Sequence, residues 1–230
     1  MEASIKDRAG KVKGSIYELR ALVEDFRMQA VGGTRAAIDL YESCIVSTLL
    51  SNSGTWTEIS EKEIKLLDEQ QNTFVRALLQ LPVSTPKASL RAAFGLLGMA
   101  WRVMEAKVML VMAIRGQEEG GLAKEVLEEQ LAMGFPGLGQ EVSKICKEIG
   151  LPDASRLDVS KEEVKEAIRL NHLAALKIEM AGKKKLEALH NSDMRREQEY
   201  VSWSLEDCRL QNRMFDCRSN MPSRYQRDLV

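Results

Sequence analysis

The segment from Leu96 to Ile114 constrains the fold more than any other part of the chain, because almost every residue in it is apolar. Its charged residues are Arg102, Glu105 and Lys107. A helix with this pattern must be buried on most of its circumference, so other helices have to surround it. The sequence therefore predicts a helical bundle built around this segment.

The composition favours helices over strands throughout the chain. Leu, Ala, Glu, Lys and Met are frequent, whereas aromatic residues make up 5% and proline occurs five times. A chain of 230 residues with 44% hydrophobic content can form one large or two small domains. We predict an all-α fold with a bundle over residues 1–116, a helical connector over 117–190, and a polar tail with one short helix over 191–230. The polar, glycine-rich stretch "RGQEEGG" marks the first boundary.

Apolar residues at steps of three and four predict two amphipathic helices near the N-terminus, the second over Thr34 to Leu50. Their expected inward residues are Ile16, Leu19, Val23, Phe26, Ile38, Tyr41 and Ile45. Shorter helices are predicted over Leu122 to Ala132 and Gln140 to Ile149. The methionines at positions 99, 104, 109 and 112 are expected to fill gaps in the core.

Two sequence patterns predict helix starts with a capping box, in which a serine and a glutamate three residues later satisfy backbone N–H groups. Ser60 and Glu63 form the first pattern, and Ser160 and Glu163 form the second. The first helix should end at Pro82, because proline lacks an N–H and clashes with the preceding turn. The second should be long and charged and extend toward His190.

The familiar signatures of catalytic and metal sites are absent from the sequence. It contains no glycine-rich phosphate loop, no G-x-S-x-G and no H-E-x-x-H. His172 and His190 are about 27 Å apart along one predicted helix, so they cannot share a metal, and we expect both to be surface or half-buried residues. The cysteines at positions 44, 146, 208 and 217 have no metal-binding spacing and indicate reduced thiols. We therefore expect no metal and no cofactor.

The distribution of apolar residues argues against secretion and membrane insertion. The balance of charges argues against attraction of a charged partner by the net charge of the whole molecule. The N-terminus lacks an apolar signal core, and the longest apolar run, within "VMLVMAI", is too short to span a bilayer. We expect an intracellular protein, in the nucleus or the cytoplasm. Because 33 basic residues nearly balance 34 acidic ones, any site for an anionic partner must be local.

Two local groups of cations are candidates for such a site. Lys13 and Arg20 recur at a seven-residue spacing that begins at Lys6, with Lys11 nearby, so a helix would align them along one side. Such a row could follow a phosphate backbone, or it could be an ordinary solvated face.

Lys87 and Arg91 form the second group, next to the turn "LPVSTP". A helix that begins near Ser84 or Ser89 would offer free N–H groups to a phosphate. The alternative is a helix corner in which the charges stay in water while Gly95 and Gly98 allow close packing.

Three collinear stretches resemble the region just after the palm in reverse transcriptases of non-LTR retrotransposons. They are "KGSIYELRALVEDFRMQAVGGTRAAIDLYESCIVSTLLSNSGTW", "LDEQQNTFVRALLQLPVSTPKASLRAAFGLLGMAWRVMEAK" and "LAKEVLEEQ". The segment "LYESCIVSTLLSN" is similar to the family pattern Leu-Tyr-x-x-x-Ile-x-x-x-Leu-Leu-x-Asn. In that family a helical thumb follows the palm and grips template and primer, and a connector leads to a cysteine-histidine knuckle.

The resemblance implies a thumb-like bundle and a connector without the catalytic part of the polymerase. The palm motif Tyr-x-Asp-Asp and the knuckle are both absent, so no catalytic or metal-binding residue can be assigned in this chain. Relatives tend to carry an acidic residue where this chain has Ala93. We expect a fragment or degraded copy of such an element.

The implied activity is non-catalytic gripping of a template-primer duplex, weak for the isolated chain, without a membrane partner. The expected phosphate contacts are Lys11, Lys13, Arg20, Lys87 and Arg91. The alternative is a stand-alone helical protein-interaction module derived from such an element. The protein partners we consider are a palm domain and a second copy of the chain, bound through exposed apolar surface.

Overall fold

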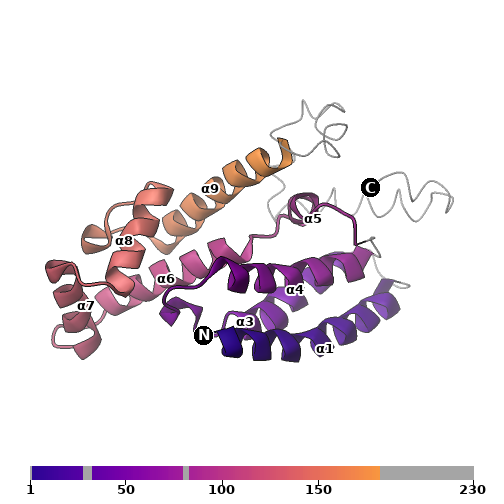
Figure 1. Ribbon diagram of the computed structural model, residues 1–230, viewed down its shortest axis with the longest axis horizontal. Helices are drawn as coiled ribbons and strands as arrows, with labels where there is room; N and C mark the ends of the chain where they lie inside the picture. Colours follow the sequence, from indigo (N-terminus) through magenta and orange to yellow (C-terminus); the bar gives the residue numbers. More distant parts are fainter. Residues whose placement is uncertain (1, 28–32, 80–82, 182–230) are drawn as a thin grey trace. The chain divides into compact units, whose positions relative to one another are not determined.

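The computed structural model describes residues 2–27, 33–79 and 83–181 (Figure 1). The predicted tail, the predicted end of the long helix at His190, and the cysteines at 208 and 217 lie outside these ranges. Within them the regular structure consists of α-helices, short 3-10 turns and one π-helical segment, with no strand. The all-α prediction is confirmed.

The described chain divides into two compact units that each combine separate stretches of sequence. Among the described residues, unit 1 contains 50–65 and 97–175, and unit 2 contains 2–27, 33–49, 66–79, 83–96 and 176–181. The boundary predicted after residue 116 does not coincide with this division, because the apolar helix before it packs with the helices that follow.

Unit 1 is built around α6 (Met99–Arg115), the apolar helix on which the bundle prediction rested. It packs against α7 (Leu122–Met133), α8 (Leu138–Ile149) and the 3-10 turn Ser53–Thr55. A second 3-10 turn, Ala154–Arg156, precedes α9 (Lys161–Ala181), which begins in this unit. The core residues are Val108, Val111, Leu127, Val142, Ile145, Cys146, Ile149, Ala154, Leu157, Val164 and Ile168.

Close approach in unit 1 depends on a small residue in the 3-10 turn before α4. A Cβ atom built at Gly54 would lie 2.9 Å from the carbonyl oxygen of Ala106 on α6.

The methionines of α6 fill space as predicted: Met99 is fully buried, and those at positions 104, 109 and 112 are partly buried against the core.

One charged residue of α6 is buried. Lys107 is only 5% exposed, and its Nζ donates to Oε2 of Glu141 on α8. The other carboxylate oxygen of Glu141 accepts from the backbone N–H of Glu58 at 3.4 Å. This pair joins three stretches of unit 1 that are distant in sequence.

The prediction that His172 is a surface or half-buried residue is wrong, because it is buried and only 6% exposed. Its Nε2 accepts a hydrogen bond from the backbone N–H of Gly98 at 3.3 Å, and its ring meets that of Trp101 edge to face. The first N–H groups of a helix have no partner within the helix. The buried imidazole supplies an acceptor for a backbone N–H at the start of α6.

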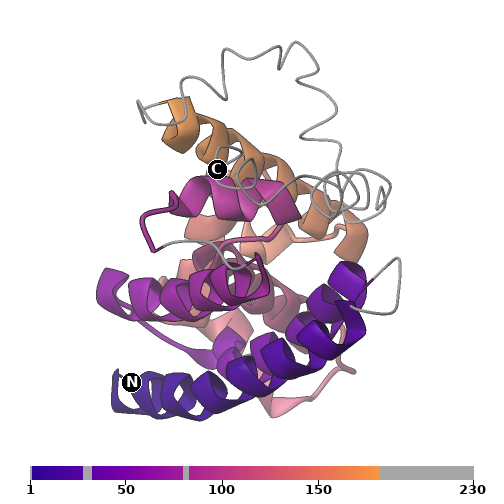
Figure 2. The same cartoon turned by 90° about the vertical axis from the view of Figure 1, so that its right-hand side faces the viewer.

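Unit 2 contains α1 (Glu2–Arg27), α2 (Gly33–Leu40), a π-helical segment Tyr41–Val46 and α3 (Ser47–Leu49). It also contains most of α4 (Glu61–Leu79) and all of α5 (Lys87–Phe94). In Figures 1 and 2, α4 lies between α1 and α5. The buried residues include Ile5, Ala9, Val12, Ile16, Leu19, Ile38, Tyr41, Ile45, Leu67, Phe74 and Val75.

The inward positions predicted in the first two helices are confirmed at Ile16, Leu19, Ile38, Tyr41 and Ile45, which are all buried. The side chains of the remaining two, at positions 23 and 26, lie outside the described part of the structure.

The helix predicted over residues 34–50 is interrupted by the π-helical segment. Hydroxyl groups of this stretch bond back to the carbonyl four residues earlier: Ser43 to Asp39 at 2.7 Å, and Thr48 to Cys44 at 2.8 Å. Such bonds compete with the regular backbone ladder and bend helices. We attribute the irregular segment to them.

Both capping boxes are confirmed. The N–H of Ser60 donates to Glu63 Oε2 at 2.7 Å, and the N–H of Glu63 donates to Ser60 Oγ at 3.3 Å. The corresponding distances for Ser160 and Glu163 are 2.6 and 3.1 Å. These bonds hold the pKa of both glutamates below the ordinary value, because they stabilise the ionised carboxylate.

The double substitution Glu63→Gln and Glu163→Gln should remove a pH-dependent part of the stability. Above about pH 4.3 the ionised carboxylates stabilise the fold, and this contribution is lost as pH falls through their lowered folded-state pKa values. The difference in unfolding free energy between the unaltered chain and the variant should therefore shrink on acidification. Urea unfolding from pH 7 to pH 3 measures it, with Glu61→Gln and Glu162→Gln as the matched control. A difference that stays constant with pH would contradict this assignment.

Candidate nucleic-acid interface

The exposed surface of α1 has two flanks, separated by the buried stripe that faces the rest of unit 2. At about 100° per residue, Lys6, Lys13 and Tyr17 fall within roughly 40° of one another on one flank. All three side chains are exposed, Tyr17 by 52%. Arg20 has the same register position, although only its backbone is described. This flank therefore places cations and an aromatic ring in one row.

Lys11 lies on the opposite flank, roughly 200° from Lys13 around the helix axis. Its Nζ is 2.7 Å from a carboxylate oxygen of Asp7, and both side chains are well exposed. The structure thus separates two of the predicted contact residues. Because an exposed ion pair of this kind contributes little free energy, the ammonium group can exchange Asp7 for another anion at low cost.

Two glycines of α1 lie beside the cation row and have no packing role in the described structure. A Cβ atom built at Gly10 or at Gly14 would meet no atom within 4 Å. Glycine inside a helix costs about 0.5–1 kcal/mol relative to alanine. Neither glycine is explained by contacts among the described residues, and both leave the α1 backbone open to close approach on this side.

The cations of α5 are held by carboxylates of α4 in the same unit. Lys87 pairs with Glu69, and Arg91 Nη2 is 2.9 Å from Asp68 Oδ2. The Arg91 and Asp68 side chains are 14% and 16% exposed, so this pair is largely withdrawn from water. The positive charge of Arg91 is thereby neutralised locally, and a phosphate would have to displace Asp68 to bind it.

The glycine after α5 is explained by helix termination. Gly95 has φ +61°, and the N–H of Leu96 donates to the carbonyl of Arg91 at 3.0 Å. This left-handed ending is the conformation in which glycine is favoured. The predicted helix start near residue 84 or 89 falls at Lys87. The side chain of Ala93 lies outside the described part of the structure.

Sequence reasoning found the row of cations but missed Tyr17 and Gly10 within it. Both follow from the helical spacing, because Gly10 is four residues after Lys6 and Tyr17 is four residues after Lys13. The partners of Lys87 and Arg91 carry no such local signal, since Glu69 and Asp68 belong to another helix.

No group of three potential ligand side chains that could hold a metal ion occurs in the ranges 2–27, 33–79 and 83–181. Among the helices described, none has both the length and the apolar character needed to cross a bilayer. Of the cysteines in these ranges, Cys44 is exposed and Cys146 is buried, and burial raises the pKa of the Cys146 thiol.

No protein-family model, curated protein or solved structure matches this chain.

Proposed function

We propose that this chain is a non-catalytic helical module that grips template-primer nucleic acid through its phosphates. This is the role implied by its resemblance to the thumb and connector of non-LTR retrotransposon reverse transcriptases. The observation that carries the proposal is the flank of α1 where exposed cations, an exposed tyrosine and two open glycines lie together. Such a surface offers charge for phosphates, a ring for stacking, and room for close approach of a backbone.

The five expected contact residues should contribute unequally. Lys13 belongs to the row of exposed side chains on α1, and Arg20 has the same register position, whereas Lys11 already pairs with Asp7. Lys87 and Arg91 should contribute least, because each already pairs with a carboxylate of α4. For these two residues the ion pairs support a structural role at the α4 and α5 contact.

The double substitution Lys6→Ala and Lys13→Ala should weaken binding of a fluorescein-labelled RNA–DNA hybrid. Loss of two phosphate contacts should flatten the slope of log affinity against log salt by roughly one to two units. Fluorescence anisotropy across a salt series measures this slope. The matched control is Lys62→Ala with Lys65→Ala, which removes two exposed lysines from the first two turns of α4.

A bulkier side chain at Gly10 tests whether the nucleic acid approaches the α1 backbone. Because a Cβ atom there meets nothing in the described structure, Gly10→Gln should not lower the unfolding free energy. It should nevertheless weaken the hybrid complex at every salt concentration.

Three outcomes of these measurements would contradict the proposal. The first is no binding at low salt by a chain whose circular dichroism shows it folded, which would favour the protein-interaction alternative. The second is an equal slope change in the lysine control. The third is unchanged affinity in Gly10→Gln, which would remove this flank from the interface.

A further inference from the structure

The helix α7 in unit 1 carries an apolar stripe on its outer side. Leu122, Val126 and Met133 fall within roughly 40° of one another around the helix axis. Their exposed fractions are 76%, 44% and 61%, and Phe135, just after the helix, is 53% exposed. The opposite side of α7 is anchored by Leu127, which is buried in the core of unit 1. Among the described residues, the stripe is therefore not needed for packing of the core of unit 1.

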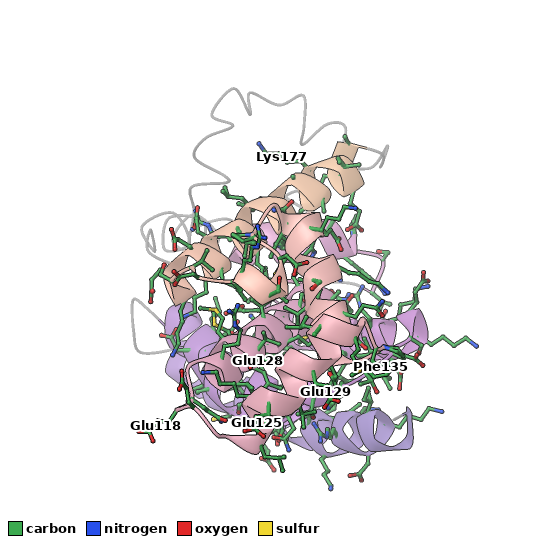
Figure 3. The ribbon with its side chains drawn as sticks, turned by 90° about the vertical axis from the view of Figure 1, so that its left-hand side faces the viewer. Glu118, Glu125, Glu128, Glu129, Phe135 and Lys177 are labelled. Carbon is green, nitrogen blue, oxygen red and sulfur yellow. The ribbon has the colours of Figure 1, made fainter. Side chains whose placement is uncertain are left out.

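One edge of this stripe is acidic. Glu125 and Glu129 lie within roughly 60° of Leu122 on the same side of the helix. Residues 117–133 contain five glutamates and one lysine. Figure 3 views this side and labels Glu118, Glu125, Glu128, Glu129 and Phe135.

The lysine of this stretch does not neutralise the acidic edge. Lys124 lies on the far side of α7 from the stripe, and its Nζ donates to the carbonyl of Gln117 at 3.4 Å. The surface thus presents three helical turns of apolar side chains with carboxylates along one margin, and it belongs to a different unit from α1.

We propose that the outer face of α7 docks an amphipathic helix of a protein partner that carries Lys or Arg along one edge. The apolar stripe fits residues spaced by three, four and seven on the partner, and the acidic margin fits the basic edge. A contact of about three turns is small, so we expect the complex to be transient. This inference does not depend on nucleic-acid binding by α1.

Charge also argues against the other occupants of this face. Phosphates of nucleic acid and of anionic lipids would meet like charge at the glutamates. In a two-fold pair of antiparallel α7 helices each margin meets its own copy, so Glu125 and Glu129 of one chain would face those of the other. An amphipathic basic helix can make apolar contact with the stripe and can also be attracted by the glutamates at its margin.

The test uses the full chain and a labelled synthetic helix with leucines at spacings of three and four and lysines elsewhere. A second peptide, in which glutamate replaces every lysine, is the charge-reversed probe. We expect the lysine peptide to bind at least about tenfold more tightly, because the reversed peptide places like charges opposite the glutamates. Anisotropy at physiological salt measures both affinities.

Two pairs of variants separate the stripe from its margin. Val126→Ser with Met133→Ser should weaken binding of the lysine peptide about tenfold or more, because apolar contact is lost. Glu125→Gln with Glu129→Gln should weaken it about twofold to tenfold and reduce its salt dependence. The matched controls are Leu170→Ser, an exposed apolar residue of α9, and Glu148→Gln, an exposed glutamate of α8. Both controls should bind as the unaltered chain does.

Several results would overturn the proposal. They are equal binding of the two peptides, a loss in the controls as large as that in the α7 variants, and self-association of the free chain that Val126→Ser abolishes. Binding to anionic vesicles that requires Met133 would assign the face to a membrane instead. Because the substituted side chains are exposed, circular dichroism should show all variants folded.

Discussion

Replacing Lys107 by alanine is expected to lower the free energy of unfolding by about 3 kcal/mol, the lower end of the range for breaking a buried ion pair. The Lys107 side chain is 6% exposed, and that of its partner Glu141 is 24% exposed. Removal of the ammonium group leaves a carboxylate poorly hydrated and without its main counterion. The cost stays at the lower end because Glu141 keeps some contact with water. Urea denaturation followed by circular dichroism measures the change.

A second substitution should recover much of this loss. In Lys107→Met with Glu141→Gln, neither side chain is charged, and the amide oxygen can still accept from the N–H of Glu58. The double variant should be more stable than the sum of the two single changes predicts, because the single changes each leave one buried charge. Simple additivity would show that the two charges are not coupled, and the cost of Lys107→Ala would then need another cause.

Replacing Tyr41 by alanine should cost about 3–5 kcal/mol, the range for deleting a large buried aromatic side chain. The Tyr41 side chain is fully buried in unit 2. Its ring stacks on that of Phe74 with centroids 4.1 Å apart and planes within 8°. The contact joins the π-helical segment to α4, so the substitution opens a cavity and also loses the ring contact.

The matched control is Tyr17→Ala on α1, which removes the same side chain from an exposed position. Surface substitutions usually change stability by less than about 0.5 kcal/mol. Thermal unfolding of both variants under the same conditions compares them directly. Similar unfolding temperatures for the two variants would show that Tyr41 does not hold α4 against the π-helical segment.

The parts of the fold that follow from neighbouring residues were predictable. Both capping boxes need only a serine and a glutamate three positions apart, and the inward faces of α1 and α2 need only a helical period. The π-helical segment was not predictable from that period. It depends on whether hydroxyls such as those of Ser43 and Thr48 bond to carbonyls of the preceding turn, which apolar spacing does not report.

The buried polar residues could not be predicted, because their partners are distant in sequence. In the sequence, Lys107 interrupts an otherwise apolar helix. Its burial could not be predicted because its partner, Glu141, belongs to another helix. His172 is predicted to be exposed or half-buried from its polar side chain alone. Its burial becomes understandable only when the N–H of Gly98 is seen to donate to it. In both cases burial follows from a pairing of helices that the sequence does not specify.

The candidate interface was partly predictable for the same reason. The seven-residue spacing placed Lys13 and Arg20 on one side of α1. Nearness in sequence added Lys11 to the group, and Lys11 lies on the opposite flank. For Lys87 and Arg91 the charges were evident from the sequence, whereas the carboxylates of α4 that hold them were not. Local spacing therefore identified the row of cations, while their availability required the tertiary structure.

The interleaved course of the chain has a consequence for how this protein can be divided. The polypeptide passes from one unit to the other at 49–50, 65–66, 96–97 and 175–176. Cutting after Gly116 would keep α6 but discard α7 and α8, whose side chains complete its core. Neither unit is one continuous stretch of sequence. A truncated or recombined chain that contains one complete unit therefore also contains an incomplete part of the other.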